Sequence, residues 1–478
     1  MKIVMKKLHF FHNLLSDRNI HIAAIAMCAL YALAGILINL NRFWQFDLGY
    51  YDFGFFDRPI WELAHFKVPI IDHFIVGGKI SLADHFNPSI FLLTPIYWFT
   101  DRSEALLIVP SIAIGLSGYI IYKTGLKILK NSVLSCAVVG VYFLYLGTQN
   151  AMYSDFHELT VASAAFAATY WAIIIKSKKW FIIFLILSLG FKESLFIFGF
   201  STGFFVFFYN KWRRLGIFTM LFSLIWGIFV LKYVLPSLSG VGYITPINLP
   251  NEPGKILSHL FTPPIKMETI VRSFLNFSFL PLLSPSLLPH IFLNFASRFL
   301  TSGSTRWDLG LHYNAEIAPT FAIATLIGMK NVSKKYIQKF EILIAGFILL
   351  LSFVLNLYIY KGPLILTVHP AFYQHTSDFE FLRDLVSQVP IDATVSAQNN
   401  LASYFLHHKE IWILRDTYTE HDPEYIVIDM REGQNPSGLL GIDNKETLFE
   451  NLSSDNKYEV FYNVGDQYVF RRNRSFKN

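Results

Sequence analysis

Charged residues are scarce in this chain. Only 15% of its 478 residues are Asp, Glu, Lys or Arg, whereas soluble domains carry about 25%. The hydrophobic residues, 53% of the total, come in runs that are longer than a soluble core needs. The run "IHIAAIAMCALYALAGILINL", residues 20–40, matches the ~20 residues that cross a bilayer. This composition excludes a soluble globular protein and predicts a polytopic membrane protein.

Cysteine is also nearly absent. Cys28 and Cys136 are the only two, and both fall inside apolar runs, so no disulfide framework is predicted. The sequence contains no Gly-rich phosphate loop, no Cys/His metal motif and no nucleic-acid signature. The first apolar run is long and lacks a small-residue cleavage site, which argues against a cleaved signal peptide.

Apolar runs recur along the first three quarters of the chain and predict an all-α polytopic transmembrane domain over residues 1–364. Several of these runs are short, so tilted helices or local thinning of the bilayer must accommodate them. The predicted spans number about eleven, at 20–40, 104–122, 132–148, 158–175, 180–191, 194–210, 215–235, 270–283, 286–300, 314–329 and 340–360.

Acidic residues are missing from four of the connections between these runs. The connections 123–131, 176–179, 211–214 and 330–339 contain Lys and Arg but no Asp or Glu. The positive-inside rule places them, and the basic N-terminus, in the cytoplasm. Counting a further apolar piece, 90–100, as a span would move all four loops outside. We therefore expect 90–100 to be an interfacial helix in the first outer loop.

The tail, residues 365–478, has shorter apolar runs and more charge. Its segment "DFEFLRDLVSQV", 378–389, has the apolar spacing of a helix. Five further segments read as short strands, namely "ATVSAQ", "EIWILRD", "EYIVIDM", "KYEVFYNV" and "QYVFRRN". The tail is predicted to be a small α/β domain on the outer side of the plasma membrane.

Ionisable side chains gather in five stretches that this topology places at the outer side. The stretches are "YDFGFFDRPIWE" (51–62), "LADHFNPS" (82–89), "MYSDFHELT" (152–160), "GFKESL" (190–195) and "RWDLGLHYNAE" (306–316). They supply the candidate catalytic residues Asp52 and Asp57, and the candidate substrate-binding residues His85, Asp155, His157, Glu158, Lys192, Glu193, Arg306, His312 and Tyr313. Ionisable groups beside apolar helices usually line a cavity or pair with each other.

Each of these groups also has a structural interpretation. Asp47 is interpreted as a solvated loop carboxylate. Asp57 and Arg58 are interpreted as an ion pair at the start of a helix. Lys192 with Glu193 reads as a structural ion pair, and the aromatic residues of 51–62 as interfacial anchors. The coincidence of five stretches on one side, rather than any one of them, favours a functional site.

The chemistry of this set fits a lipid-linked substrate. A partly desolvated carboxylate is suited to act as a general base on a hydroxyl acceptor. Lys and Arg are suited to hold a phosphate leaving group, and carboxylates with His are also ligands for a divalent cation, so the cofactor is left open. The predicted reaction is sugar transfer from a polyprenyl-phosphate donor to an unknown acceptor.

The motifs resemble those of a family of polytopic membrane proteins, the domain-of-unknown-function 2079 family. The matching pieces include "YYDFGFFDRPIWE", "DHFNPSIFLLTPIY", "SDFHE", "LGLHYNAEIAPTFAIA" and "PEYIVIDM", spread over about 45–475. The family usually has Gln where Arg58 stands and an acid where Ser194 stands. More distantly, the family resembles the GT-C glycosyltransferases, and this likeness implies a catalytic Asp in the first outer loop, at Asp52.

Two other functions are compatible with the sequence. A transporter or flippase would use the same intramembrane charges to line a pathway, although no inverted repeat of broken helices is visible. A non-catalytic envelope scaffold would use the tail to bind a partner.

Overall fold

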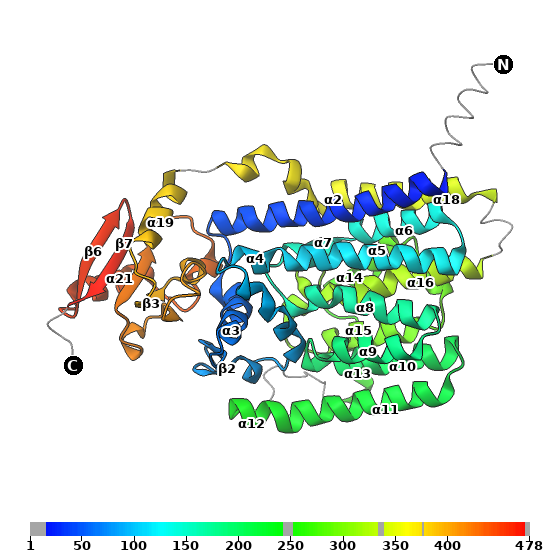
Figure 1. The fold of residues 1–478 in the computed structure, drawn as a ribbon, viewed down its shortest axis with the longest axis horizontal. Coiled ribbons are helices and arrows are strands. Elements are labelled where there is room, and N and C mark those ends of the chain that lie inside the picture. Colours follow the sequence, from blue (N-terminus) through cyan, green and yellow to red (C-terminus); the bar gives the residue numbers. More distant parts are fainter. Residues whose placement is uncertain (1–15, 242–251, 333–338, 375–376, 474–478) are drawn as a thin grey trace, which may run out of the picture.

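In the computed structural model, residues 16–241, 252–332, 339–374 and 377–473 are described. The basic start of the chain, with Lys2, Lys6 and Lys7, lies outside the described residues, as do Lys334 and Lys335. Figure 1 shows a bundle of roughly parallel and antiparallel helices with a smaller domain at one end. We call this end of the bundle the domain end and the opposite end the loop end.

The apolar runs form helices because a helix satisfies every backbone N–H and C=O within itself, which lipid requires. The helices of the bundle are α2 (Asp17–Trp44), α4 (Glu104–Leu107), α5 (Val109–Leu129), α6 (Ser132–Leu144), α7 (Leu146–Tyr153), α8 (Glu158–Ile174), α9 (Lys178–Leu189), α10 (Phe196–Tyr209), α11 (Arg213–Phe229), α12 (Leu235–Ser239), α13 (Pro253–His259), α14 (Pro264–Asn276), α15 (Leu288–Phe299), α16 (Ile317–Asn331) and α18 (Glu341–Val354).

All eleven predicted spans coincide with helices, but few of these helices are long enough to cross a membrane alone. Among the described residues, four stretches have the required length and apolarity, at Asp17–Trp44, Glu104–Leu129, Arg213–Ser239 and Glu341–Tyr360. The pair α6 and α7 qualifies only as one span, bent by 54°. The predicted number of eleven full crossings is therefore not confirmed. Short helices such as α8 and α16 are buried almost throughout, as expected for helices that are apolar all round.

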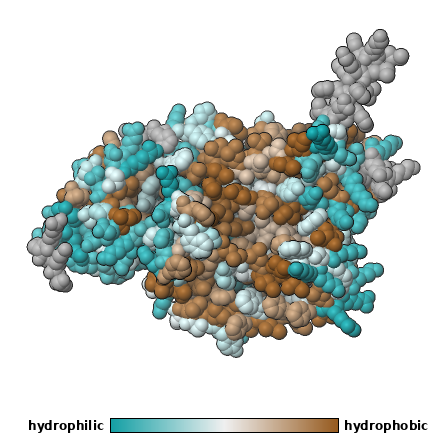
Figure 2. All heavy atoms as spheres, viewed as in Figure 1, coloured by the Kyte–Doolittle hydropathy of each residue, from teal (hydrophilic) through white to brown (hydrophobic). Residues whose placement is uncertain are grey.

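The surface of the bundle is apolar in a broad belt. Figure 2 shows this belt as brown atoms between a polar domain end and a polar loop end. Large apolar side chains are exposed along α2, α11 and α18, for example Leu30, Ile225 and Leu343. In water such a patch would favour aggregation, whereas in a bilayer it faces lipid.

The first connection of the chain covers the domain end of the bundle. It contains the π-helix η1 (Tyr50–Gly54), α3 (Phe55–Ala64), the two-residue strands β1 (Ile70–Ile71) and β2 (Lys79–Ile80), and the 3₁₀ helices η2 (Ser81–Ala83) and η3 (Pro88–Trp98). The piece predicted to be interfacial is η3, which contains Pro95 and is not among the span candidates of the described residues.

The tail forms the predicted helix and all five predicted strands. Helix α19 (Ser377–Ser387) precedes a sheet of order β4-β3-β5-β7-β6, with β3 (Thr394–Ala397) parallel to β4 (Glu410–Ile413) and β5 (Tyr425–Asp429). Strands β6 (Tyr458–Val464) and β7 (Gln467–Arg472) complete it as an antiparallel pair. The short α20 (Asn399–Ala402) follows β3, and α21 (Lys445–Ser454) packs Leu448 and Leu452 against the sheet.

The tail domain docks on the first connection through buried polar contacts. The Arg58 guanidinium donates to the carbonyl oxygens of Leu406, His408 and Lys409, and its Nε donates to Glu62. The expected Asp57–Arg58 pair is therefore absent. A guanidinium supplies more donors for such contacts than a neutral amide side chain has.

The aromatic residues of the first connection correct a second expectation. Tyr50, Phe53, Phe55 and Phe56 are buried, so they are not interfacial anchors. The expectation failed because the tail domain and the bundle together cover this segment, and burial of aromatic area inside the protein stabilises it more than partial exposure at the interface.

Candidate active site

Helix η1 carries Asp52 at the domain end of the bundle. Its start is held by Asn399 of the tail domain, whose Oδ1 accepts from the Tyr51 backbone N–H at 2.9 Å. Gly49 precedes this turn, and a Cβ at Gly49 would lie only 2.6 Å from the Asn399 amide nitrogen. A side chain is therefore not accommodated at position 49. Asp52 itself is 59% exposed, with Oδ1 4.0 Å from His157 Nε2.

Two histidines from distant parts of the chain stack beside Asp52. His157 precedes α8, and His312 lies in η8 (His312–Asn314), before α16. Their ring centroids are 3.5 Å apart with an interplanar angle of 23°. Burial lowers the pKa of His157 to about 3, and burial together with His157 lowers the pKa of His312. Both rings are therefore neutral near pH 7, which removes the repulsion that two stacked cations would suffer.

A buried ion pair lies close to His157. Lys192 Nζ donates to Glu158 Oε1, and both side chains are almost fully buried. The second Glu158 oxygen, Oε2, has no hydrogen-bond partner among the described residues. The predicted partner of Lys192 was its neighbour Glu193, but the carboxylate that pairs with it is Glu158, from the start of α8.

Glu193 instead binds the returning part of the first connection. His85 Nδ1 lies 3.1 Å from Glu193 Oε1, and the Phe86 backbone N–H donates to Glu193 Oε2 at 3.2 Å. The Ser89 N–H donates to the Gly190 carbonyl at 2.8 Å. These bonds attach the first connection to the turn between α9 and α10, and they bring His85 to the site.

A salt bridge near Asp52 was not apparent from the sequence. Arg42, at the end of α2, bonds to Asp155 at 2.9 Å and to Asp47 at 2.7 Å. Asp47 is therefore ion-paired rather than merely solvated. Arg42 lies just past the predicted span 20–40 and was given no role from the sequence, so only the fold shows that it pairs with these carboxylates.

The surroundings of Asp52 disfavour its charged form. Desolvation by the protein packed around its inner side raises the pKa of Asp52 to about 7. The negative charge of Asp155 acts in the same direction, while Arg42 opposes it. Asp52 therefore combines an exposed carboxylate with a pKa near neutrality, a combination typical of general bases.

Tyr313 and Arg306, the remaining predicted residues, lie next to His312. We call the ionisable residues around Asp52 and the two histidines the Asp52 cluster. The Tyr313 ring lies 4.2 Å from the His312 ring, and the Arg306 guanidinium carbon lies 5.1 Å from the Tyr313 centroid. Arg306 is partly exposed, so its charge is accessible from the domain end.

His73 is a second residue that sequence reasoning missed. Its Nδ1 accepts from the backbone N–H groups of Ile75 and Val76, so Nε2 carries the proton in the neutral ring. Nε2 lies 3.1 Å from the Tyr51 hydroxyl and 3.5 Å from Asp84 Oδ1. A histidine nine residues from the nearest recognised stretch gave no local signal.

Asp57 lies apart from this cluster and is fully buried. Its carboxylate accepts from the Tyr97 hydroxyl, from Ser103 at 3.3 Å and from His407 Nε2 at 2.7 Å. His407 belongs to the tail domain, so Asp57 links η3, α4 and that domain. The structure thus brings together ten of the eleven predicted site residues and separates the eleventh.

The described residues contain no group of three or more His, Cys, Asp or Glu side chains placed to hold a metal ion. The divalent cation that the sequence left open therefore gains no site in the described parts of the chain.

The fold and this cluster define a multi-pass membrane protein with an ionisable site at one end of its helix bundle. The chain belongs to the family described as predicted membrane protein (DUF2079), whose model matches residues 42–467. The family membership predicted from the motifs is thus confirmed. No curated protein sequence matches the chain.

The chain is similar in fold to a crystal structure of ArnT from Cupriavidus metallidurans bound to undecaprenyl phosphate. The TM-score is 0.50 at 10% identity, covering 94% of this chain and 98% of that one. ArnT in the apo state gives a TM-score of 0.46 at 10% identity, covering 95% and 99%. The first match agrees with the predicted GT-C-like architecture, and at this identity it concerns the fold alone.

Proposed function

We propose that this protein is a membrane glycosyltransferase that transfers a sugar from a polyprenyl-phosphate donor to an acceptor at the extracytoplasmic face. The observation that carries the proposal is the position of Asp52. It is an exposed carboxylate with a pKa near 7, beside two neutral histidines and a partly exposed Arg306. In this proposal the domain end faces outward, the N-terminus is cytoplasmic, and residues 365–478 form the extracytoplasmic domain.

The proposed reaction is a single displacement. The acceptor hydroxyl oxygen forms a bond to the anomeric carbon of the sugar while Asp52 takes the hydroxyl proton. The bond between the anomeric carbon and the phosphate oxygen breaks, and its electron pair leaves on the polyprenyl phosphate. Asp57 is the less favoured candidate for the base because it has no exposed surface and three hydrogen-bond partners.

Cationic and polar groups of the cluster would bind the donor phosphate. Arg306 is the first candidate, because its guanidinium is accessible and suits a phosphate geometrically. Lys192 is almost fully buried and its charge is compensated by Glu158, so it would position the site rather than contact the phosphate. Glu193, which is bonded to His85, would have the same role. Tyr313, His157 and His312 would form the wall beside the sugar.

An apolar groove beside the cluster suits a lipid tail. It has a volume of about 440 Å³ and lies between η3, α9 and α11, where Leu92, Ile186 and Phe222 line it. Gly190 also lines the groove and is two residues from Lys192. A polyprenyl chain in this groove would place its phosphate at the polar cluster. Undecaprenyl phosphate, bound by the similarly folded ArnT, belongs to this lipid class.

The test is turnover of labelled polyprenyl-phosphate sugars by the protein in nanodiscs, followed as release of the lipid phosphate. We expect Asp52→Asn to lower turnover at least about 100-fold, the usual scale for loss of a general base. The matched control is Asp392→Asn, which changes an exposed carboxylate without a hydrogen bond or ion pair among the described residues. Equal turnover by the two variants would contradict the assignment. Solute flux that depends on Lys192 would favour transport instead.

A further inference from the structure

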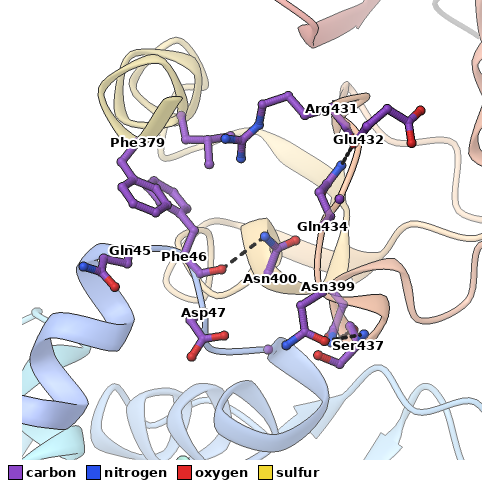
Figure 3. Close-up of a pocket in the computed structure, with 15 residues that line it drawn as sticks. Gln45, Phe46, Asp47, Phe379, Asn399, Asn400, Arg431, Glu432, Gln434 and Ser437 are labelled. Carbon is purple, nitrogen blue, oxygen red and sulfur yellow. Dashed lines mark hydrogen bonds between the residues drawn. The ribbon is translucent and has the colours of Figure 1, made fainter. Parts of the chain in front are cut away.

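A polar cleft separates the first connection from the tail domain. Its volume is about 360 Å³, within the range of roughly 300–1,000 Å³ typical of small-molecule sites. Figure 3 shows its walls: Gln45, Phe46 and Asp47 follow α2, and Phe379 comes from α19. Asn399 and Asn400 begin α20, and the other labelled residues follow β5. The cleft is separate from the Asp52 cluster, although Gly49 lines it and lies three residues before Asp52.

The cleft lies where the topology of the tail sheet favours a ligand. Strand β3 is parallel to β4 on one side and to β5 on the other, so the chain leaves β3 for β4 and then returns to β5. The residues just beyond the carboxyl ends of β3 and β5, Asn399 and Arg431, both line the cleft. In open α/β sheets, ligands bind in the crevice at this change of direction.

The charges of the cleft disfavour an ionic ligand. Among the described residues that line the cleft, Arg431 is the only basic one, and its guanidinium is bound to Asp429 and also to Asp378. Of the two carboxylates, Asp47 is paired with Arg42, and Glu432 lies 3.2 Å from Lys445. A phosphate would find no uncommitted cation here, and a metal ion would find no group of three ligands among the described residues.

Uncommitted hydrogen-bonding groups in the cleft suit hydroxyl groups. Within the described part of the chain, Gln45 Oε1, Asp47 Oδ1 and Asn435 Nδ2 make no hydrogen bond, although the other polar atoms of these side chains do. They offer two acceptors and one donor. Phe379 adds an aromatic side chain to the lining of the cleft.

We propose that this cleft is a saccharide-binding site that holds the acceptor glycan. Saccharide binding is independent of the proposed reaction, whereas the identification of the ligand as acceptor rests on the proposed function. Gly49 lines the cleft and directly precedes η1, which carries Asp52, so the cleft adjoins the proposed base along the chain. The salt bridges of Arg42 connect the two sites physically, since Asp47 lines the cleft and Asp155 neighbours Asp52.

The experiment measures binding rather than turnover. Full-length protein in fluorescently labelled nanodiscs is applied to a printed array of defined oligosaccharides. Ser437 is exposed at the cleft, so Ser437→Trp fills it without replacing a core residue. Ser453, exposed on α21 and lining no part of the cleft, provides the matched control Ser453→Trp.

We expect the wild type and Ser453→Trp to be retained on the same oligosaccharides, and Ser437→Trp to bind at least about 10-fold more weakly, a change of about 1.4 kcal/mol. Asp52→Asn binds like the wild type, which separates this result from failure of the reaction. If Ser437→Trp does not fold, Phe379→Ala replaces it, with Phe379→Tyr as the conservative rescue. No retention of the wild type on any oligosaccharide overturns the proposal, and so does retention that the cleft variants leave unchanged.

Discussion

The imidazole rings of His157 and His312, 155 positions apart in the sequence, stack with their centroids 3.5 Å apart. Such a stack tolerates two neutral rings but not two cations. The stack also lies beside the proposed base, because Asp52 Oδ1 is 4.0 Å from His157 Nε2. The protonation of this pair therefore affects both the stability of the domain end and the surroundings of the proposed base.

The histidine stack predicts a loss of stability in acid. The folded state holds the pKa of His157 at about 3, below its ordinary value of 6.5. Between these values the unfolded chain binds a proton that the folded protein does not, so stability falls as the pH drops from about 6.5 toward 3. We expect a slope of up to about 1.4 kcal/mol per pH unit. Thermal unfolding of the wild type and His157→Gln across this interval checks it, and equal slopes would contradict it.

Asp52 predicts the pH dependence of turnover. A general base must be deprotonated, and the pKa of Asp52 is raised to about 7. Turnover should thus be nearly constant above this pH and fall about tenfold for each unit below it. The measurement is kcat/KM of the nanodisc protein from acid to alkaline pH. A profile that stays flat down to the ordinary pKa of Asp, 3.8, would argue against Asp52 as the base.

The buried pair of Lys192 and Glu158 predicts a non-additive effect on stability. Lys192→Met leaves the Glu158 carboxylate buried without its partner and should cost about 3–5 kcal/mol. The double variant with Glu158→Gln should recover most of this loss, because both charges are then removed. The exposed pair Lys255–Glu252 serves as the control, where Lys255→Met should cost less than about 1 kcal/mol. Denaturant unfolding of the wild type, Lys192→Met, Glu158→Gln and the double variant measures the coupling, and additive losses would refute it.

Substitution of Asp57 is predicted to affect stability, whereas substitution of Asp52 is predicted to affect turnover. Asp57→Asn weakens the bonds to Tyr97, Ser103 and His407 and should lower the free energy of unfolding by about 1.5–3 kcal/mol. It should also expose the junction with the tail domain to limited proteolysis. Asp52→Asn should leave both properties unchanged and remove turnover. Loss of turnover in a stably folded Asp57→Asn would instead assign the base to Asp57.

The sequence by itself determined the class of the protein and the elements of its fold. Long apolar runs must become helices in a bilayer, and the alternation in the tail must become strands, because both follow from local patterns of side chains. The sequence also named the residue types of the site, since Lys192 and Glu193 stand out within an apolar run. The motifs, which occur in the same order as in the family, indicated the family to which the chain belongs.

Only the tertiary structure decided which of these residues meet. Arg58 bonds to the carbonyl of Leu406, 348 positions away, and Arg42 joins Asp47 to Asp155. No local pattern encodes such contacts, because they arise when distant segments pack at the same end of the bundle. The same packing buried Asp57 in a hydrogen-bonded junction and left Asp52 exposed. Burial and partners, rather than residue type, therefore distinguish the two carboxylates that the sequence presented as near equals.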